Sequence, residues 1–475
     1  MAKLRTAARR AASRLMVPSI LVAAIAQPSL AQEPIGDLSD DAYAALDEVT
    51  EQSVTATVSF LASDELQGRK TATASFDVAA AYVASRLQAA GAVGLGEDGS
   101  YFVINSVPTW RDPTDATLAT GGATLKATAM RATDETIEFS GSIPSIDDAT
   151  DEQTVVFSNL YDQDTSDSKN AKAAVLEISN KAREKDIDAV LVLVNPQSAL
   201  WQNATQRQQS RRLRATKDKS PAIMLVAAKK LRADALYKVR IPKVEIEYYP
   251  MRNVAAIIRG RDEEAAKKAI LFSAHLDHLG VKPDAAAGED AIFNGADDDA
   301  TGVTAVLTLA DVFGKLENKP LHSTIFMTFW GEEMGLLGST AFGEAPAWPL
   351  EDMIANVNIE MIGRPADGAN NKMWMTGWNK SDLGTLFAQG ARRVGVEVFE
   401  HPQFSAVLYT RSDNYALAKQ GVVAHSFSAG SLHKDYHKVT DEWTKLDLPH
   451  MTQIIRGIFA GAMPIAEGKL TPKSK

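Results

Sequence analysis

Histidine and carboxylate side chains that could bind a metal gather in the last two-fifths of the chain. All eight histidines of the 475 residues lie at or after position 275. The first motif, His275-Leu276-Asp277-His278, directly follows the apolar run Ala269–Ala274. Neutral imidazole is a common zinc ligand, and a carboxylate two residues on can orient it. This motif therefore indicates metal or acid–base chemistry, with a polar surface turn as the alternative.

Three consecutive acids form the second motif, within Asn294–Gly302. Neighbouring negative charges repel one another unless a positive charge lies among them. The start of the helix expected at Val303–Leu316 could relieve part of this charge. Because capping needs only one acid, a bound cation accounts for Asp297, Asp298 and Asp299 better.

Two adjacent glutamates, Glu332 and Glu333, follow the apolar run Ser323–Trp330 and are flanked by glycines. Adjacent residues that leave a strand point in different directions. One glutamate can then bind a metal while its neighbour reaches a water on that metal as a general base. A charged, exposed turn is the alternative interpretation.

Two more candidates complete the set. Glu360 follows the apolar run Met353–Ile359, and His437 lies in the polar loop Asp435–Asp441, with His433 as its competitor. Each position is weak evidence alone. Together, acid and imidazole sites at successive strand ends form a constellation that chance seldom produces.

The elements that position these residues alternate regularly from about residue 247. Apolar strands are expected at Val254–Ile258 and at the three runs named above, with an amphipathic helix at Val303–Leu316. Nearly continuous apolar strands are typical of parallel sheets covered on both faces. The fold class is therefore α/β, with a mostly parallel mixed sheet flanked by helices. Active sites of such folds lie at the carboxyl ends of the strands.

The order of motifs resembles the co-catalytic dizinc exopeptidase family. This family includes bacterial leucyl aminopeptidases and, more distantly, glutamate carboxypeptidase, glutaminyl cyclase and transferrin receptor. The residues that carry the resemblance are His275-x-Asp277, Gly295–Gly302, Gly331–Ser339, Glu360-Met361 and Tyr436-His437. Phe60–Arg69 also looks like the family's amino-terminal helix motif. The segment 112–246 looks like a β-rich α/β protease-associated domain, which some members carry.

The resemblance implies a role for each matched residue. Asp298 would bridge two zinc ions, which are completed by His275 with Glu360 and by Glu333 with His437. Glu332 would be the general base, Asp277 would orient His275, and Tyr409 would polarise the scissile carbonyl or hold the oxyanion. The family usually has aspartate where this chain has Glu360, so the longer side chain could shift that metal or change its preferred ion.

The expected organisation is a signal peptide over residues 1–31 and a peptidase domain split into residues 32–111 and 247–475. The inserted domain of residues 112–246 separates the two parts. The signal peptide is indicated by a basic start, the short apolar run Leu15–Ile25 and the small-x-small site Ser29–Ala31. We therefore expect export to a bacterial periplasm or to the outside, with no stable membrane insertion after cleavage.

Composition excludes other classes of protein. The chain has no cysteine, which rules out disulfides, thiolate metal sites and cysteine nucleophiles. Its net charge of −10 makes nucleic acid an unexpected partner. The sequence thus predicts an exported zinc aminopeptidase acting on peptides. The alternatives are a carboxypeptidase or dipeptidase, a glutaminyl cyclase-like enzyme, or a non-catalytic binding protein on the same scaffold.

Overall fold

The computed structural model describes most of the chain beyond the amino-terminal segment. The described residues are 37–150, 153–163, 168–207, 212–213, 220–282, 285, 288–366 and 368–475. The expected signal peptide, residues 1–31, lies outside them. None of the helices in the described part is long and apolar enough to cross a membrane.

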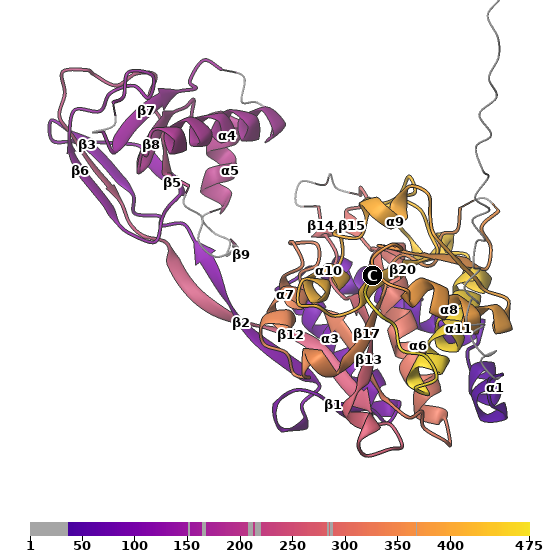
Figure 1. The fold of residues 1–475 in the computed structure, drawn as a ribbon. Helices are drawn as coiled ribbons and strands as arrows, with labels where there is room; N and C mark the ends of the chain where they lie inside the picture. The colour runs from indigo at the N-terminus through magenta and orange to yellow at the C-terminus, as the bar shows by residue number, and fades with distance from the viewer. Residues whose placement is uncertain are drawn as a thin grey trace, which may run out of the picture. The chain divides into compact units, whose positions relative to one another are not determined.

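A large mixed sheet forms the framework of the larger part of the molecule (Figure 1). Its strands follow the order β19-β18-β20-β17-β13-β16-β12-β2-β9, and β1 also pairs with β12. The bounds are β1 Val93–Gly94, β2 Phe102–Arg111, β9 Arg212–Leu213, β12 Glu245–Ile258, β13 Ala269–His275, β16 Ser323–Phe329, β17 Met353–Ile359, β18 Lys372–Met375, β19 Glu397–Phe399 and β20 Ala424–Ser428.

The centre of this sheet is parallel, as the apolar runs predict. Strand β13 pairs in parallel with β16 and β17, and β17 pairs in parallel with β20. All seven residues of β13 and of β16 are buried. His275, the last residue of β13, is paired with Phe329, the last residue of β16. The carboxyl ends of these strands therefore meet at one edge, from which the candidate site residues follow.

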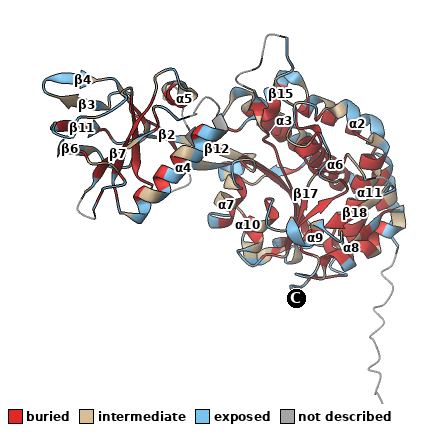
Figure 2. Ribbon diagram, turned by 90° about the horizontal axis from the view of Figure 1, so that it is seen from above, coloured by how far each residue is buried: buried red, intermediate tan, exposed pale blue. Residues whose placement is uncertain are grey.

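Helices cover the sheet on both faces. Alternate residues of β13 point to opposite sides, so Phe272 packs on Phe313 of α6 while Leu271 joins a cluster with Phe342 of α7 and Leu417 of α10. Buried residues fill β17 and much of α6 and α11 (Figure 2). The helix bounds are α1 Asp40–Asp47, α2 Glu51–Leu61, α3 Ala74–Ala89, α6 Thr301–Lys315, α7 Leu337–Glu344, α8 Leu383–Ala391, α9 Phe404–Val407, α10 Asn414–Ala418 and α11 Leu448–Ala466.

Between β2 and β12 the chain builds two sheets of four strands each. One has the order β5-β10-β8-β7 and the other β4-β3-β11-β6. The bounds are β3 Thr117–Thr120, β4 Ala123–Leu125, β5 Ala127–Arg131, β6 Ile137–Gly141, β7 Val155–Asn159, β8 Ala189–Leu193, β10 Ala222–Val226, β11 Tyr237–Ile241, α4 Ser168–Glu184 and α5 Ala199–Arg207.

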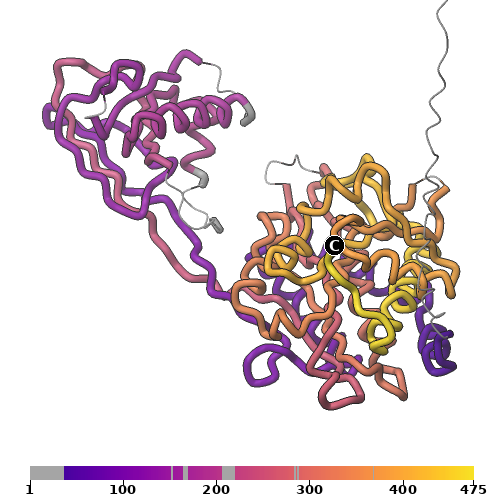
Figure 3. The backbone as a smooth tube through the Cα atoms, in the orientation of Figure 1, coloured from indigo at the N-terminus to yellow at the C-terminus, as the bar shows by residue number. Residues whose placement is uncertain are grey.

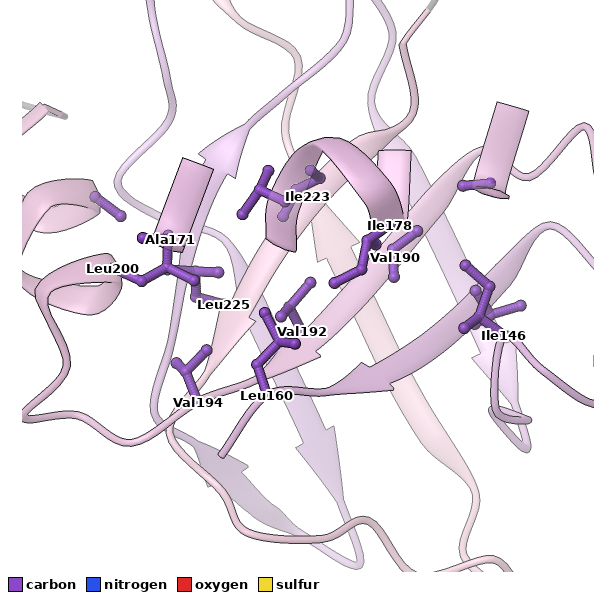
Figure 4. Close-up of a cluster of buried hydrophobic side chains, with 14 of the residues drawn as sticks. Ile146, Leu160, Ala171, Ile178, Val190, Val192, Val194, Leu200, Ile223 and Leu225 are labelled. Atoms are coloured by element: carbon purple, nitrogen blue, oxygen red, sulfur yellow. The ribbon is translucent and has the colours of Figure 1, made fainter. Parts of the chain in front are cut away.

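This inserted segment has its own apolar core. Val190 and Val192 of β8 pack with residues of α4 and α5 (Figure 4), whereas the alternate residues Leu191 and Leu193 pack with residues of the second sheet. The strands β2 and β12 that lead into and out of the segment run side by side (Figure 3), and their pairing begins at Arg111 opposite Glu245. The chain thus leaves the large sheet through β2 and re-enters it through the neighbouring β12, and the short strand β9 of the inserted segment also pairs with β2.

Candidate metal centre

Asp298 lies between two groups of ligand atoms. Its Oδ1 is 3.1 Å from Nε2 of His275, which is 3.3 Å from Oε1 of Glu360. Its Oδ2 is 3.1 Å from Nε2 of His437, which is 3.3 Å from Oε2 of Glu333. The structure thus brings together all five residues that the sequence predicts as metal ligands, with one oxygen of Asp298 toward each group.

The two groups fit divalent cations such as zinc. Two ligands of a tetrahedral zinc, with bonds of about 2.0–2.1 Å, lie about 3.3 Å apart, which is the spacing seen around both oxygens of Asp298. The donors are carboxylate oxygen and imidazole nitrogen, a set that zinc accepts. Oδ2 of Asp298 is also buried without a hydrogen-bond donor among the described residues, and a cation would satisfy it.

The flanking acids of the triplet stabilise the loops around Asp298. Asp299 accepts hydrogen bonds from the backbone amides of His275, Gly302 and Met361 at 3.0–3.3 Å. A side chain at position 302 would collide with that carboxylate at about 2.4 Å, so glycine is needed there. Asp297 accepts from the amide of Gly363 at 2.8 Å. Asp298 is therefore the acid of the triplet that faces the ligand groups, while Asp297 and Asp299 stabilise the loops.

The two candidate histidines of the late loop have different neighbours. Nε2 of His433 lies 3.2 Å from the carboxylate of Asp297, whereas His437 faces Asp298 and Glu333. His437 also has a left-handed backbone, with φ of 55°, which non-glycine residues adopt infrequently. The geometry therefore favours His437 over its competitor.

A buried arginine supports the same loops from the amino-terminal motif. The guanidinium of Arg69 donates to the backbone carbonyls of Leu61, Leu276, Asn294 and Gly295. Burial lowers the pKa of Arg69 to about 10, although the nearby acids raise it. These hydrogen bonds all end on neutral carbonyl groups. The positive charge of Arg69 is therefore not paired with one acid and offsets the negative charges of the carboxylates around it. Arg69 is the last residue of the motif Phe60–Arg69, and the spacing of that motif does not indicate these contacts.

A chain of buried hydrogen bonds holds Glu360. Oε2 of Glu360 accepts from Ser412 at 2.5 Å, and Ser412 accepts from the amide of Asn358 at 2.9 Å. Asn358 in turn accepts from Ser273 on the neighbouring strand at 2.8 Å. These contacts anchor the second oxygen of Glu360 and leave Oε1 toward His275. The side chain is longer than the aspartate usual in the family, and Ser412 fixes its end.

The role expected of Asp277 needs a correction. Nδ1 of His275 contacts the backbone carbonyl of Asp277 at 3.0 Å, while the carboxylate lies 4.0 Å away. The carboxylate instead accepts from Thr71 at 2.9 Å and from the amide of Glu332 at 3.1 Å. Asp277 therefore orients the histidine through its main chain and braces the glutamate pair through its side chain. Sequence spacing cannot separate these two contacts.

Glu332 belongs to neither ligand group. Burial, with the negative charges of Glu360 and Asp413 adding to it, raises the pKa of Glu332 well above its usual range. By contrast, the burial of Glu333 is outweighed by its close contacts with His278 and His437, which lower its pKa to about 2. The adjacent glutamates thus differ as the sequence argument expects, one available for proton transfer and the other held as an anion.

Tyr409, the expected oxyanion partner, lies apart from these groups. Its ring packs on Tyr415 and His425, and it contacts neither ligand group in the described part of the chain. Tyr436 instead stacks on His437 and lines a pocket with Glu360, and burial together with the charges of Asp298 and Glu360 raises its pKa. The sequence argument quoted Tyr436 only as the neighbour of His437. It also left His278 unused, although His278 lies within 4.8 Å of ligand atoms of Asp298 and Glu333.

A pocket opens beside Glu360 and Tyr436. Its apolar lining comes from Met361, Trp374, Phe404, Leu408 and Leu432. The remaining lining is polar and comprises Thr376, Arg411, Ser412, Ser426, Ser428 and Ser431. The pocket could receive a substrate side chain next to the metal centre.

The family profile that matches this region is that of peptidase family M28, over residues 253–461. These residues contain all of the ligands described above. The resemblance to the dizinc exopeptidases, predicted from the motifs, is confirmed.

Relatives with curated names match part of this chain. A "Vacuolar membrane protease" of Pyricularia oryzae is 28% identical over 123 residues, 23% of this chain and 11% of that protein. A "Probable zinc metalloprotease" of Pyrenophora tritici-repentis is 29% identical over 115 residues, 24% of this chain and 25% of that protein. The chain therefore spans a quarter or less of the length of these relatives.

Solved structures share the fold over most of the chain. The aminopeptidase from Aneurinibacillus sp. strain AM-1 aligns with 89% of this chain and 95% of its own, with TM-score 0.51 and 16% identity. A zinc aminopeptidase from Bacillus subtilis aligns with 89% of this chain and 97% of its own, with TM-score 0.51 and 15% identity. The expected α/β fold class is confirmed.

Proposed function

We propose that this protein is an aminopeptidase that uses two zinc ions to release single residues from the amino end of peptides. The observation that carries the proposal is Asp298, whose two oxygens face two separate ligand groups at matching distances. A single ion would need only one of these groups. The zinc-named relatives and solved structures support the choice of metal.

Zinc ions held there would lower the pKa of a bound water and polarise the scissile carbonyl. Glu332 is the group that takes the proton from the attacking water and returns it to the leaving amine. Its raised pKa suits this exchange, because a general base works best when its pKa is near the working pH. Tyr436, which lines the pocket, replaces Tyr409 in our proposal as the hydroxyl that donates to the developing oxyanion.

The charges at the site favour the amino end of a peptide. Glu360 lines the pocket, and although burial lowers the pKa of His275, the charges of Glu360 and Glu332 raise it, so both carboxylates lie close to the metal centre. A protonated amine is attracted to such carboxylates, and a terminal carboxylate is repelled. The apolar lining next to Glu360 suits a first residue with an aliphatic or aromatic side chain.

One observation favours a second candidate. Arg411 lines the same pocket, and a guanidinium recognises carboxylates. It would suit a carboxypeptidase or an acidic first residue. Export by a cleaved signal peptide and a protease-associated identity for residues 112–246 also belong to our proposal, on the sequence pattern alone.

The test is product analysis on matched peptides with the zinc-loaded protein. One peptide begins with leucine and has a free amine, a second is its acetylated form, and a third begins with aspartate. We expect stepwise loss from the amino end of the first, at least tenfold slower loss from the third and none from the second. Loss from the carboxyl end, or equal attack on the acetylated peptide, would refute the proposal in favour of a carboxypeptidase.

A further inference from the structure

His278 is a buried histidine beside the second ligand group, and neither the proposed reaction nor the five ligands uses it. Its side chain is fully buried, and Nδ1 lies 2.6 Å from Oε1 of Glu333. Neither atom has a hydrogen-bond partner of regular geometry among the described residues, so this close contact leaves both of them free to pair. A side chain at Gly295 would meet the ring at 2.5 Å, so the glycine leaves the space that the imidazole fills.

The distances separate two possible roles for this ring. Two ligands of one tetrahedral zinc lie about 3.3 Å apart, and His437 keeps distances of 3.1 and 3.3 Å from Asp298 and Glu333. The 2.6 Å between His278 and Glu333 is too short for that geometry and falls in the range of a charge-assisted hydrogen bond. Nδ1 is also 3.9 Å from Oδ2 of Asp298, beyond the spacing of the other ligands.

We propose that His278 is a positioning residue for Glu333. When zinc is bound, Nδ1 would donate a hydrogen bond to Oε1, which lies 2.6 Å away, and Oε2 would be left for the metal that Asp298 and His437 hold. Glu333 then contributes one oxygen rather than two, which leaves a coordination position open for water or substrate. The inference rests on the two-zinc centre proposed above and adds to it the residue that sets the geometry of the second ion.

Three variants of the full-length protein test the proposal through metal binding. His278→Asn keeps a donor at the position of Nδ1, His278→Gln moves the donor to the position of Nε2, and His278→Leu removes it. Zinc content and the two dissociation constants are measured by titration of metal-free protein against a chelating dye, and cobalt spectra report the coordination. Asn and Gln are both polar amides, so this pair keeps the test valid if the Leu variant does not fold.

We expect wild type to bind two zinc ions and His278→Asn to bind both within about threefold of wild type. His278→Gln and His278→Leu should bind one of the two ions about 10–100-fold more weakly, as loss of a supporting contact to a ligand does. If Asn weakens binding as much as Leu, the ring is a ligand and the proposal fails. If all three bind zinc like wild type, the ring only fills space and the proposal fails. A wild type that binds fewer than two ions would overturn the two-zinc function itself.

Discussion

Strands β13 and β8 look alike, yet only β13 ends in the candidate metal centre. Each is buried along its whole length and has a parallel neighbour on both sides. Strand β13 ends at His275, and Glu332 and Glu360 follow its neighbours β16 and β17. Strand β8 is followed by Val194 and Asn195. A buried parallel strand therefore supplies the framework in both sheets. Whether a site forms depends on the residues at its carboxyl end.

The interiors of the two sheets also differ. The strand interiors of the large sheet contain hydrogen-bonded polar groups such as Ser273 and Asn358, which lead to Glu360 through Ser412. The five residues of β8 and the five of β10 are all apolar. A buried polar group stabilises only when it is paired, so its presence indicates that the sheet positions something. The following predictions test this division between a sheet that positions ligands and one that only packs.

The largest expected effect comes from a strand-end residue outside both ligand groups. Glu332→Gln removes the proposed base while keeping its size and its backbone contact with Asp277. We expect kcat to fall about 10²–10⁴-fold, the usual contribution of a general base, with zinc content unchanged. Steady-state kinetics and metal analysis measure the two quantities. The exposed Glu351→Gln is the matched control and should behave like wild type. A near-normal rate in Glu332→Gln would show that strand-end position alone does not identify the base.

Sequence patterns predicted the strands and the helix well, because the spacing of apolar residues along the chain follows from which side chains are buried. The runs 269–274, 323–330 and 353–359 became β13, β16 and β17 with ends shifted by at most one residue. The helix expected at Val303–Leu316 became α6 at Thr301–Lys315. Continuous apolar runs leave few alternatives, since such a strand must lie between two covered faces.

Sequence patterns predicted the ligand positions but not every contact. The five predicted ligands meet at Asp298, whereas Asp277 uses its carbonyl on His275 and Tyr409 packs away from the site. Arg69 lies more than 200 residues from the loops that it binds. Such long-range contacts depend on tertiary packing, which local spacing does not contain. His278 is the third residue of the first motif with a side chain that could bind a metal or a proton, but no pattern indicated its partner.

A second substitution tests the packing sheet. Leu225 of β10 is fully buried, is paired with Val192 of β8 and belongs to the cluster against α4 and α5. Leu225→Ala should lower the free energy of unfolding of the inserted segment by about 2–5 kcal/mol, because a cavity replaces the side chain. Denaturant unfolding measures this loss. The exposed Leu236→Ala should change stability by less than about 0.5 kcal/mol. Zinc content should stay constant in both, and a loss of zinc in Leu225→Ala would end the separation of roles argued above.

The smallest expected effect is a pH dependence that belongs to the large sheet. His425 of β20 is buried, contacts Ser381 and the carbonyl of Thr376, and burial lowers its pKa to about 4. Between about pH 6.5 and 4 the unfolded chain binds this proton and the folded chain does not, so stability is lost as pH falls through that window. The loss amounts to about 3 kcal/mol at most.

His425→Asn keeps a donor toward Thr376 but cannot titrate, so the variant should lose less stability than wild type between pH 7 and 4.5. Both proteins are measured without metal, because zinc release at low pH would add a second effect. Buried Asp413, whose pKa burial raises to about 7, acts in the opposite direction. It is present in both proteins, so it cancels in the difference between them. The segment that contains β8 and β10 has no histidine and so cannot contribute this pH-dependent loss of stability. Equal pH dependence in the two proteins would therefore mean that His425 is not held neutral, and that buried polar groups of the large sheet are less constrained than their contacts indicate.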